Sequence, residues 1–184
     1  MSFLDKKEFL SLIGHNKTDS ELCPVFNYNS LKPKLNFSHS KPFGHNNLFI
    51  IERKLLTIFG FPQYGIHGNC WSLNKNKIFF HFAVRSKKLE DFPGLYDNLF
   101  AGGQPQGISI KNNLKKEAFE EAGLKDIRNK NLIRGGTINY FHEYSNNIHS
   151  GIIFVYDLLL EGEKLINIDG EVDHFVSTEV FQIY

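Results

Sequence analysis

Cysteine is scarce in this sequence, which contains only Cys23 and Cys70 among its 184 residues. The two lie far apart, and neither has the close partner that a Cys-x-x-Cys metal or redox motif requires. Small secreted domains that depend on disulfides carry several pairs of cysteines, so this count argues against a disulfide framework. We expect both thiols to be reduced and the protein to be cytoplasmic.

An excess of charge of either sign is also missing. Lys and Arg total 21 and Asp and Glu total 20, which gives a formal net charge of +1. Without a basic stripe, nucleic acid is not an expected partner. No stretch approaches the ~20 apolar residues that span a bilayer, and Asp5, Lys6 and Lys7 interrupt the apolar start of the chain. We therefore expect neither a membrane segment nor a signal peptide.

The remaining composition is that of an ordinary globular domain. Hydrophobic residues make up 41% of the chain and charged residues 22%, and the length suits one domain with a sizeable core. Residues 1–13 predict a short amphipathic helix, and residues 14–47, rich in Asn, Ser, His, Lys and Pro, predict a loosely structured lead-in. We therefore divide the chain into an N-terminal region, 1–47, and a main domain, 48–184.

Apolar residues in the main domain recur mostly with the periodicity of strands. Residues 64–73 and 77–86 predict one hairpin, and residues 131–144 and 149–160 predict a second. A helix lies between the two hairpins in the sequence. Strands on both sides of a helix favour an α/β fold, with a mixed β-sheet between helices in an α/β/α sandwich.

This helix carries three carboxylates close together, on Glu117, Glu120 and Glu121. At about 100° per residue they fall within an arc of roughly 100°, and each such pair destabilises an isolated helix by roughly 0.2–0.5 kcal/mol. Ser109 and Gly123 are suited to be its N-cap and C′ residues. The neighbouring sector is apolar and predicts a core face, formed by Leu114, Ala118, Ala122 and Phe119. The acidic face is either solvated or neutralised by a hard divalent cation.

A glycine-rich segment precedes the helix. Ala101, Gly102 and Gly103 follow an apolar stretch, 98–100, that is typical of the end of a strand, and a turn at 105–107 leads into the helix. A strand, a glycine-rich loop and an acidic helix bring backbone carbonyls and carboxylates to one point, where a metal-bound diphosphate could lie.

This layout resembles the Nudix box, the signature of the Nudix hydrolase family. The pattern is Gly, five residues, Glu, seven residues, Arg-Glu, an aliphatic residue, any residue, Glu-Glu, any residue, Gly and an aliphatic residue. Aligned from Gly102, the chain supplies in register Glu117, Glu120, Glu121, Gly123 and Leu124. Ile108 stands at the position of the first glutamate and Lys116 at that of the arginine. Lysine keeps the charge of arginine but loses its planar fork.

Four segments, 64–71, 83–88, 92–109 and 169–175, are similar to one Nudix branch, the domain associated with thiamine pyrophosphokinase. Members of that branch commonly carry a non-acidic residue and a lysine at the two departing positions. The resemblance to this branch therefore implies that Ile108 and Lys116 are features of the branch.

The resemblance implies a hydrolase that cleaves a diphosphate linked to another group, with Mg²⁺ (or Mn²⁺) as cofactor. It implies that Glu117 and Glu121 are metal ligands, that Glu120 shares a metal and that the carbonyl of Ala101 completes the shell. The general base stays open between Glu117 and Glu171, which is also read as a turn residue.

On the substrate side, the resemblance implies roles for Gly102, Gly103 and Lys116, and His67 is a candidate to face the ligand. The implied partner is a small-molecule diphosphate, with thiamine diphosphate or an oxidised analogue, cleaved to the monophosphate, as the leading candidate. Nucleoside diphosphate sugars and dinucleotides stay open. We expect a monomer or a homodimer.

Two other functions use the same fold. One is a non-catalytic binding or remnant protein, which the far end of the sequence favours. Residues 170–177 predict a last short strand, and a helix starting at Ser177 or Thr178 has little length before Tyr184. Nudix domains of this kind usually close with a helix. The other is an isopentenyl-diphosphate-type isomerase, for which Cys70 would have to be the active-site cysteine.

Overall fold

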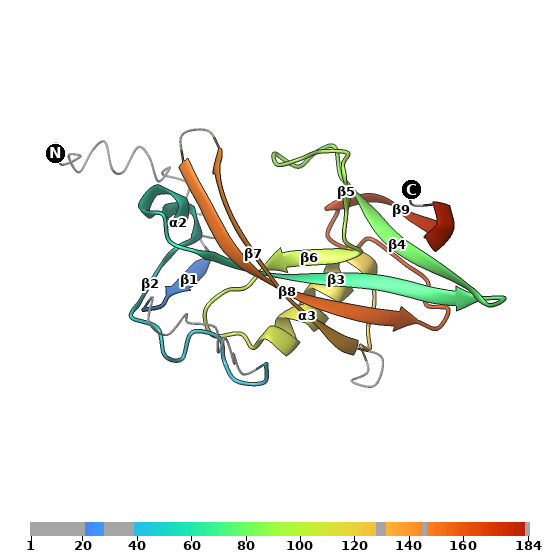
Figure 1. Ribbon diagram of the computed structural model, residues 1–184, viewed down its shortest axis with the longest axis horizontal. Coiled ribbons are helices and arrows are strands. Elements are labelled where there is room, and N and C mark those ends of the chain that lie inside the picture. Colours follow the sequence, from blue (N-terminus) through green and yellow to red (C-terminus); the bar gives the residue numbers. More distant parts are fainter. Residues whose placement is uncertain (1–20, 28–38, 128–131, 145–146, 183–184) are drawn as a thin grey trace.

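The computed structural model describes residues 21–27, 39–127, 132–144 and 147–182 (Figure 1). A mixed sheet of seven strands organises it, with β5, β4, β3, β8 and β7 side by side in that order, β6 paired with β3 and β9 paired with β4. The strands are β3 Gln63–Asn74, β4 Lys77–Arg85, β5 Tyr96–Asp97, β6 Phe100–Gly103, β7 Leu132–Tyr144, β8 Asn147–Leu160 and β9 Val172–Glu179.

Both predicted hairpins are confirmed. β3 and β4 are antiparallel neighbours, with Cys70 opposite His81. Lys75 and Asn76 form their turn with positive φ angles of 48° and 63°, as expected for the two-residue turns whose twist suits a hairpin. β7 and β8 form the second antiparallel pair.

The centre of the sheet is the parallel pair β3–β8, which runs from Gln63 opposite Gly151 to Ser72 opposite Leu160. Side chains from this pair, including Ile66 and Phe154, are fully buried in the main core. Parallel strands are buried because the chain must cross over between them and cover the sheet. Together with the helices, this mixed sheet confirms the predicted α/β fold.

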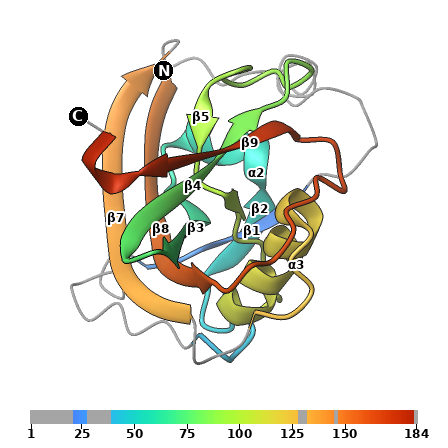
Figure 2. The ribbon, with the colours of Figure 1, turned by 90° about the vertical axis from the view of Figure 1, so that its right-hand side faces the viewer.

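The predicted acidic helix is α3, Ile110–Ala122, and its expected ends are confirmed. The Asn112 N–H donates to Ser109 Oγ at 3.2 Å, and Gly123 ends the helix in the left-handed conformation with φ 71°. Figure 2 shows α3 beside the central strands, with β7 at the far edge of the sheet.

The expected core face of α3 is correct at three of its four residues. Leu114, Ala118 and Ala122 are fully buried, whereas Phe119 is 40% exposed. At about 100° per residue, Phe119 lies roughly 60° beyond Ala122 and turns toward solvent, while Glu121 falls between Leu114 and the other glutamates. Glu121 is therefore buried although its side chain is ionisable.

Part of the expected lead-in pairs with the main domain. β1, Leu22–Val25, is antiparallel to β2, Phe49–Glu52, and the short helix α2, Arg53–Phe59, follows directly. The helix expected at residues 1–13 lies outside the described residues. The boundary at residue 47 stays a prediction.

The helix expected from Ser177 or Thr178 is wrong. Ser177 and Thr178 belong to β9, where they pair with His81 and Phe80 of β4, and only a 3₁₀ turn, η2 Val180–Gln182, follows. The partner strand supplies hydrogen bonds that outweigh the weak local preference for a short helix. None of the described helices has the length and apolar character needed to cross a membrane.

Candidate functional site

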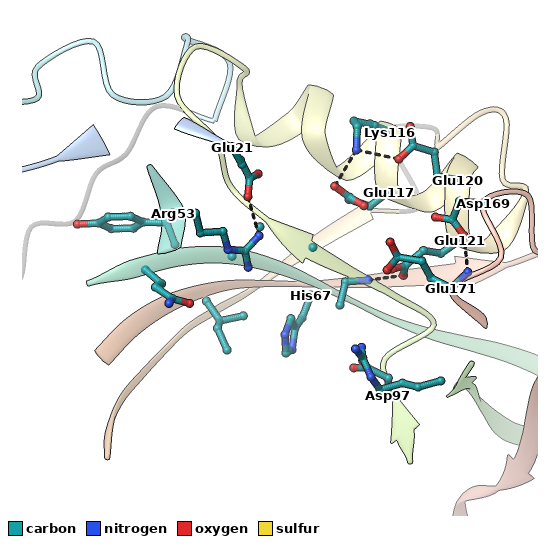
Figure 3. A pocket seen from close by; sticks show the side chains of 18 of the residues that line it. Glu21, Arg53, His67, Asp97, Lys116, Glu117, Glu120, Glu121, Asp169 and Glu171 are labelled. Atoms are coloured by element: carbon teal, nitrogen blue, oxygen red, sulfur yellow. Dashed lines mark hydrogen bonds and ion pairs between the residues drawn. The ribbon is translucent and has the colours of Figure 1, made fainter. Parts of the chain in front are cut away.

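A cavity of about 400 Å³ opens between α3, β6 and the ends of β3 and β7 (Figure 3). Five carboxylates line its α3 end, those of Glu117, Glu120, Glu121, Asp169 and Glu171. Of the residues predicted for the site, all line this cavity: Ala101, Gly102, Gly103, His67, Lys116, Glu117, Glu120, Glu121 and Glu171. The fold thus brings together residues that are more than a hundred positions apart in sequence, such as His67 and Glu171.

Gly102 makes room for Glu117. A Cβ atom at Gly102 would lie 2.4 Å from Cδ of the Glu117 side chain, a distance that real Cβ atoms do not show. Gly102 and Gly103 belong to strand β6 rather than to the loop that the sequence suggested. The missing side chain lets α3 press a carboxylate against the backbone of the strand.

Glu121 is the most buried of the carboxylates, with 8% of its surface exposed. The Ala101 N–H donates to Glu121 Oε2 at 2.8 Å. Burial raises the pKa of Glu121 to about 8, an effect that this hydrogen bond opposes and the charge of Glu117 increases. A carboxylate in this position needs either a proton or a nearby cation.

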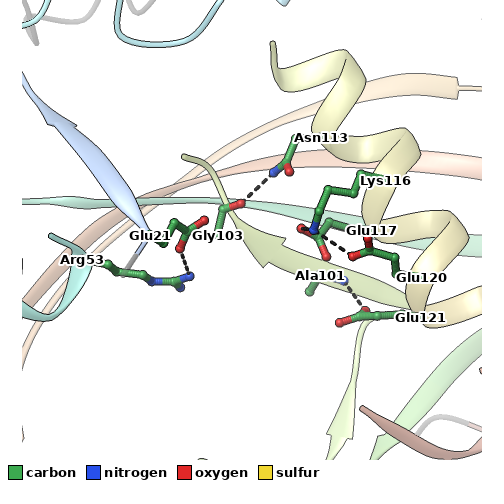
Figure 4. Close-up of polar contacts among 9 residues, drawn as sticks. All are labelled: Glu21, Arg53, Ala101, Gly103, Asn113, Lys116, Glu117, Glu120 and Glu121. Carbon is green, nitrogen blue, oxygen red and sulfur yellow. Dashed lines mark hydrogen bonds and ion pairs between the residues drawn. The ribbon is translucent and has the colours of Figure 1, made fainter. Parts of the chain in front are cut away.

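Lys116 sits between the other two helix glutamates. Its Nζ atom lies 3.2 Å from Glu117 Oε1 and 2.7 Å from Glu120 Oε2 (Figure 4). Burial raises the pKa of the Glu117 carboxyl, and the charge of Lys116 opposes that shift. The lysine that replaces the arginine of the box thus holds two carboxylates with one point charge.

Asp169 and Glu171 reach the cavity from the loop before β9. The Asp169 N–H donates to the Glu120 carbonyl at 3.2 Å, and the Glu171 N–H donates to Asp169 Oδ1 at 2.9 Å. The Glu171 carbonyl in turn accepts from the Ser86 N–H at 2.8 Å. These bonds fix Glu171 as part of an ordered loop whose backbone is tied to both α3 and β4. Sequence reasoning did not single out Asp169.

His67 lies on β3 opposite Ala101 and lines the cavity. Burial lowers the pKa of its imidazole, while the nearby charge of Asp97 opposes the shift. A neutral imidazole at this place offers one donor and one acceptor.

Two ion pairs complete the lining, and sequence reasoning missed both. Arg53 Nη1 lies 2.6 Å from Glu21 Oε2, and Arg85 Nη1 lies 2.8 Å from Asp97 Oδ2. Tyr140 of β7 also lines the cavity. No short motif links these partners, because strand pairing brings them together.

The donor chemistry fits a divalent cation. Hard cations such as Mg²⁺ and Mn²⁺ prefer carboxylate oxygens, and a cation would favour the charged form of Glu121. In the arrangement seen among the described residues, no three His, Cys, Asp or Glu side chains lie close enough to hold an ion. Lys116 and the Ala101 N–H hold the helix carboxylates instead. Ala101 thus contacts the Glu121 carboxylate through its N–H. The resemblance implied a different role, in which the carbonyl of Ala101 binds a metal.

Cys70, the cysteine that an isomerase would need, lies elsewhere. It is fully buried, burial raises its pKa strongly, and it lines a separate hollow with Phe80 and Phe82. It is not among the residues that line the carboxylate cavity.

The chain was compared with protein-family models, with curated proteins and with solved structures. No protein-family model matches the chain. Nudix hydrolase 24, chloroplastic, from Arabidopsis thaliana is 36% identical to it over 136 residues, 73% of this chain and 37% of that protein. The chain thus spans little more than a third of the length of this relative.

Solved structures share the fold at low sequence identity. DR0079 from Deinococcus radiodurans has a TM-score of 0.54 at 13% identity, covering 85% of this chain and 82% of that chain. The NUDIX domain of NrtR from Shewanella oneidensis, complexed with ADP ribose, has a TM-score of 0.52 at 10% identity, covering 66% of this chain and 75% of that chain. The relative shares sequence with this chain and the two structures share its fold; the chain belongs to the Nudix hydrolase family.

Proposed function

We propose that the protein is a pyrophosphohydrolase, which uses Mg²⁺ or Mn²⁺ to cleave a diphosphate linked to another group. The observation that carries the proposal is the buried Glu121, at an end of the cavity that four further carboxylates line, namely those of Glu117, Glu120, Asp169 and Glu171. Buried like charges are costly unless a counter-charge is present. A metal-bound diphosphate brings that counter-charge into the cavity together with the substrate.

Glu117, Glu120 and Glu121 are the residues that would hold the metal. When bound, the ion supplies charge neutralisation and polarises the phosphoryl oxygens. The chain positions these carboxylates through Gly102, which admits Glu117, and through the Ala101 N–H, which orients Glu121. Lys116 lies between Glu117 and Glu120 and limits their repulsion.

The reaction is attack by water on one phosphorus. A bond forms between phosphorus and the water oxygen, and the bond to the bridging oxygen breaks. A terminal diphosphate such as thiamine diphosphate then gives a monophosphate and inorganic phosphate, whereas a diphosphate that joins two groups, such as ADP ribose, gives two monophosphates. A carboxylate accepts the proton that water loses. Glu117, whose pKa is raised by burial, and Glu171, on the opposite loop, are the two candidates for this base.

Thiamine diphosphate and its oxidised analogues are the substrates that we propose to test first. The resemblance of residues 64–71 and 92–109 to the thiamine-pyrophosphokinase-associated branch supports this choice. ADP ribose belongs beside them, because the NrtR domain with the same fold was solved with that ligand. An isomerase function has no support from Cys70, which is buried away from the cavity.

The experiment is a hydrolysis screen of the purified protein against these diphosphates, with Mg²⁺, with Mn²⁺ and with EDTA. We expect metal-dependent release of phosphate or of a monophosphate from at least one of them. Glu171→Gln and Glu117→Gln are then compared on that substrate, and the pH–rate profile that loses its acidic limb identifies the base. Absence of turnover on every diphosphate, with the protein folded, would favour the non-catalytic binding protein.

A further inference from the structure

The Glu21–Arg53 pair lies at the end of the cavity that the carboxylate cluster does not occupy. Figure 4 shows the pair beside Gly103, while Glu117 and Glu121 lie farther along β6 near Ala101. Arg53 Nη1 donates to Glu21 Oε2 at 2.6 Å, and the Arg53 N–H donates to the Glu21 carbonyl at 2.9 Å. Side chain and backbone therefore fix the two residues relative to each other.

Gly103 gives this pair its access to the cavity. A Cβ atom at Gly103 would lie 2.1 Å from Arg53 Nη1 and 2.9 Å from Glu21 Oε2. Neighbouring side-chain positions on a strand point to opposite faces, so the two consecutive glycines serve different partners. Gly102 admits Glu117 and Gly103 admits the ion pair.

The pair keeps hydrogen-bonding capacity for a ligand. Arginine has five N–H donors, and among the described residues the only side chain that accepts from the Arg53 guanidinium is Glu21. The side chains of Arg53 and Glu21 are 44% and 29% exposed, and both line the cavity. Unused donors of the guanidinium and an unused oxygen of the carboxylate therefore stand next to each other.

Tyr140 provides a flat wall near this pair. It lies opposite Gly151 on the neighbouring strand, and a Cβ atom at Gly151 would come within 2.5 Å of its ring. Tyr140 and Arg53 line the same cavity, and the charge of Arg53 opposes the rise in the pKa of Tyr140 that burial causes. An aromatic ring beside a guanidinium favours a planar, polar ligand.

The distance to the carboxylates suits one substrate molecule. Consecutive Cα atoms are ~3.8 Å apart, and the close contacts at Gly102 and Gly103 then place Arg53 Nη1 within about 12 Å of the Glu117 carboxyl. Both side chains line the same cavity, so one substrate molecule that carries a diphosphate can reach from one to the other. A second anion is not favoured at this end, because Glu21 already neutralises Arg53.

We propose that Glu21, Arg53 and Tyr140 recognise an amino-substituted pyrimidine ring, alone or fused in a purine, on the group that carries the diphosphate. Arg53 donates to a ring nitrogen, Glu21 accepts from the exocyclic amino group, and Tyr140 packs against the ring face. The proposal rests on the proposed function and makes Glu21, just before β1, and Arg53, at the start of α2, part of the specificity site.

Binding of the ring alone tests the proposal without any hydrolysis. We would titrate thiamine and adenosine, which carry the ring but no phosphate, into the full chain in EDTA by calorimetry. Arg53→Met and Glu21→Gln should weaken binding at least ~10-fold, because an unpaired polar partner remains in the site. Lys77→Met is the matched control: it removes another exposed ion pair, Lys77–Glu179, and should leave binding unchanged.

A charge-swapped double variant, Glu21→Arg with Arg53→Glu, separates recognition from stability. It restores an ion pair, so a purely structural role would restore ring binding along with the melting temperature. Recognition instead predicts a normal melting temperature and lost ring binding. Ring binding that survives in Arg53→Met or in the swap would overturn the proposal, as would failure of the unaltered protein to bind either ring.

Kinetics on any ring-bearing diphosphate that the protein hydrolyses give a second measurement. Arg53→Met should raise KM at least ~10-fold and leave kcat within ~3-fold, because the contact is made equally in ground and transition states. A fall in kcat with unchanged KM would overturn the proposed role. Failure of the proposed hydrolase function is a different result, namely no diphosphate cleaved by the unaltered protein.

Discussion

The two ends of the cavity differ in how their charges are balanced. At the α3 end, five carboxylates line the cavity, and Lys116 pairs with only two of them, Glu117 and Glu120. At the other end, Glu21 and Arg53 neutralise each other at 2.6 Å. An end with excess charge requires a cation, whereas an end with balanced charge is ready to bind a neutral polar group. Exposed ion pairs stabilise a fold by only about 0–1 kcal/mol, so stability alone gives little reason for the Glu21–Arg53 pair to face the cavity.

Glu121→Gln should have the largest effect on catalysis. The amide keeps the shape of the side chain and still accepts from the Ala101 N–H, but it removes the charge that a metal requires. We expect kcat to fall at least ~100-fold with the fold intact, as measured by metal-dependent hydrolysis and circular dichroism. Glu143→Gln, at an exposed position of β7, is the control. Near-normal turnover in Glu121→Gln would show that the carboxylates at the α3 end of the cavity are not needed for catalysis.

Alanine at each of the paired glycines should affect the two ends separately. Gly102→Ala pushes the Glu117 carboxylate away and should lower kcat about 10-fold or more on every substrate. Gly103→Ala displaces the ends of two flexible side chains and should raise KM about 10-fold for ring-bearing diphosphates only. Both substitutions collide with side-chain tips rather than backbone, so both variants should fold. The same change in kcat and KM in both variants would contradict the separate roles of Gly102 and Gly103.

Stability without metal should depend on pH through Glu121. Burial raises its pKa from an ordinary value of 4.5 to about 8, so the native state keeps a proton that the unfolded chain has lost. The free energy of unfolding should therefore fall as pH rises from about 4.5 to about 8. In EDTA the melting temperature should drop across this window, and Mg²⁺ should reverse most of the drop near pH 8. Glu121→Gln should flatten the profile; an equally steep profile in that variant would assign the effect to another group.

Ile108→Glu should have the smallest effect. Ile108 stands where the general Nudix box has a glutamate, yet it is not among the residues that line the cavity. Its carbonyl accepts from the Gln104 side chain at 2.9 Å and from the Phe43 N–H at 3.1 Å, which anchors the loop. We expect kcat to change less than ~3-fold in a steady-state assay. A gain of ten-fold or more would indicate a crippled enzyme.

Sequence reasoning located the acidic end because its signals are local. Ser109 and Gly123 cap α3 through contacts within a few residues, and the spacing of the glutamates follows from helix geometry alone. The two hairpins were predictable for the same reason. Phe119 was wrongly predicted to lie on the core face because it is hydrophobic, although its angle on the helix turns it toward solvent.

The ion-paired end and the last strand depend on contacts between distant residues. Glu21 meets Arg53 because β1 pairs with β2, and no pattern in the sequence specifies that pairing. Ser177 is in a strand because β4 is its neighbour. Asp169 enters the cavity because its loop bonds to the carbonyl of Glu120. Local propensity carries little information about any of these contacts.

The parallel pairing of β3 with β8 should also delay the formation of the cavity during folding. Asn69 and Asp157, which meet across that pair at 2.9 Å, are 88 residues apart. Closing so long a loop costs chain entropy before any contact repays it, and sheets built from distant segments fold slowly. Helix α3 and both hairpins consist of local contacts, which we expect to form early. Glu171 is held near α3 and β4 by bonds between distant residues, and we expect it to approach Glu117 only after those elements have packed together. Enzymatic activity should therefore return later than secondary structure when the unfolded chain is allowed to refold.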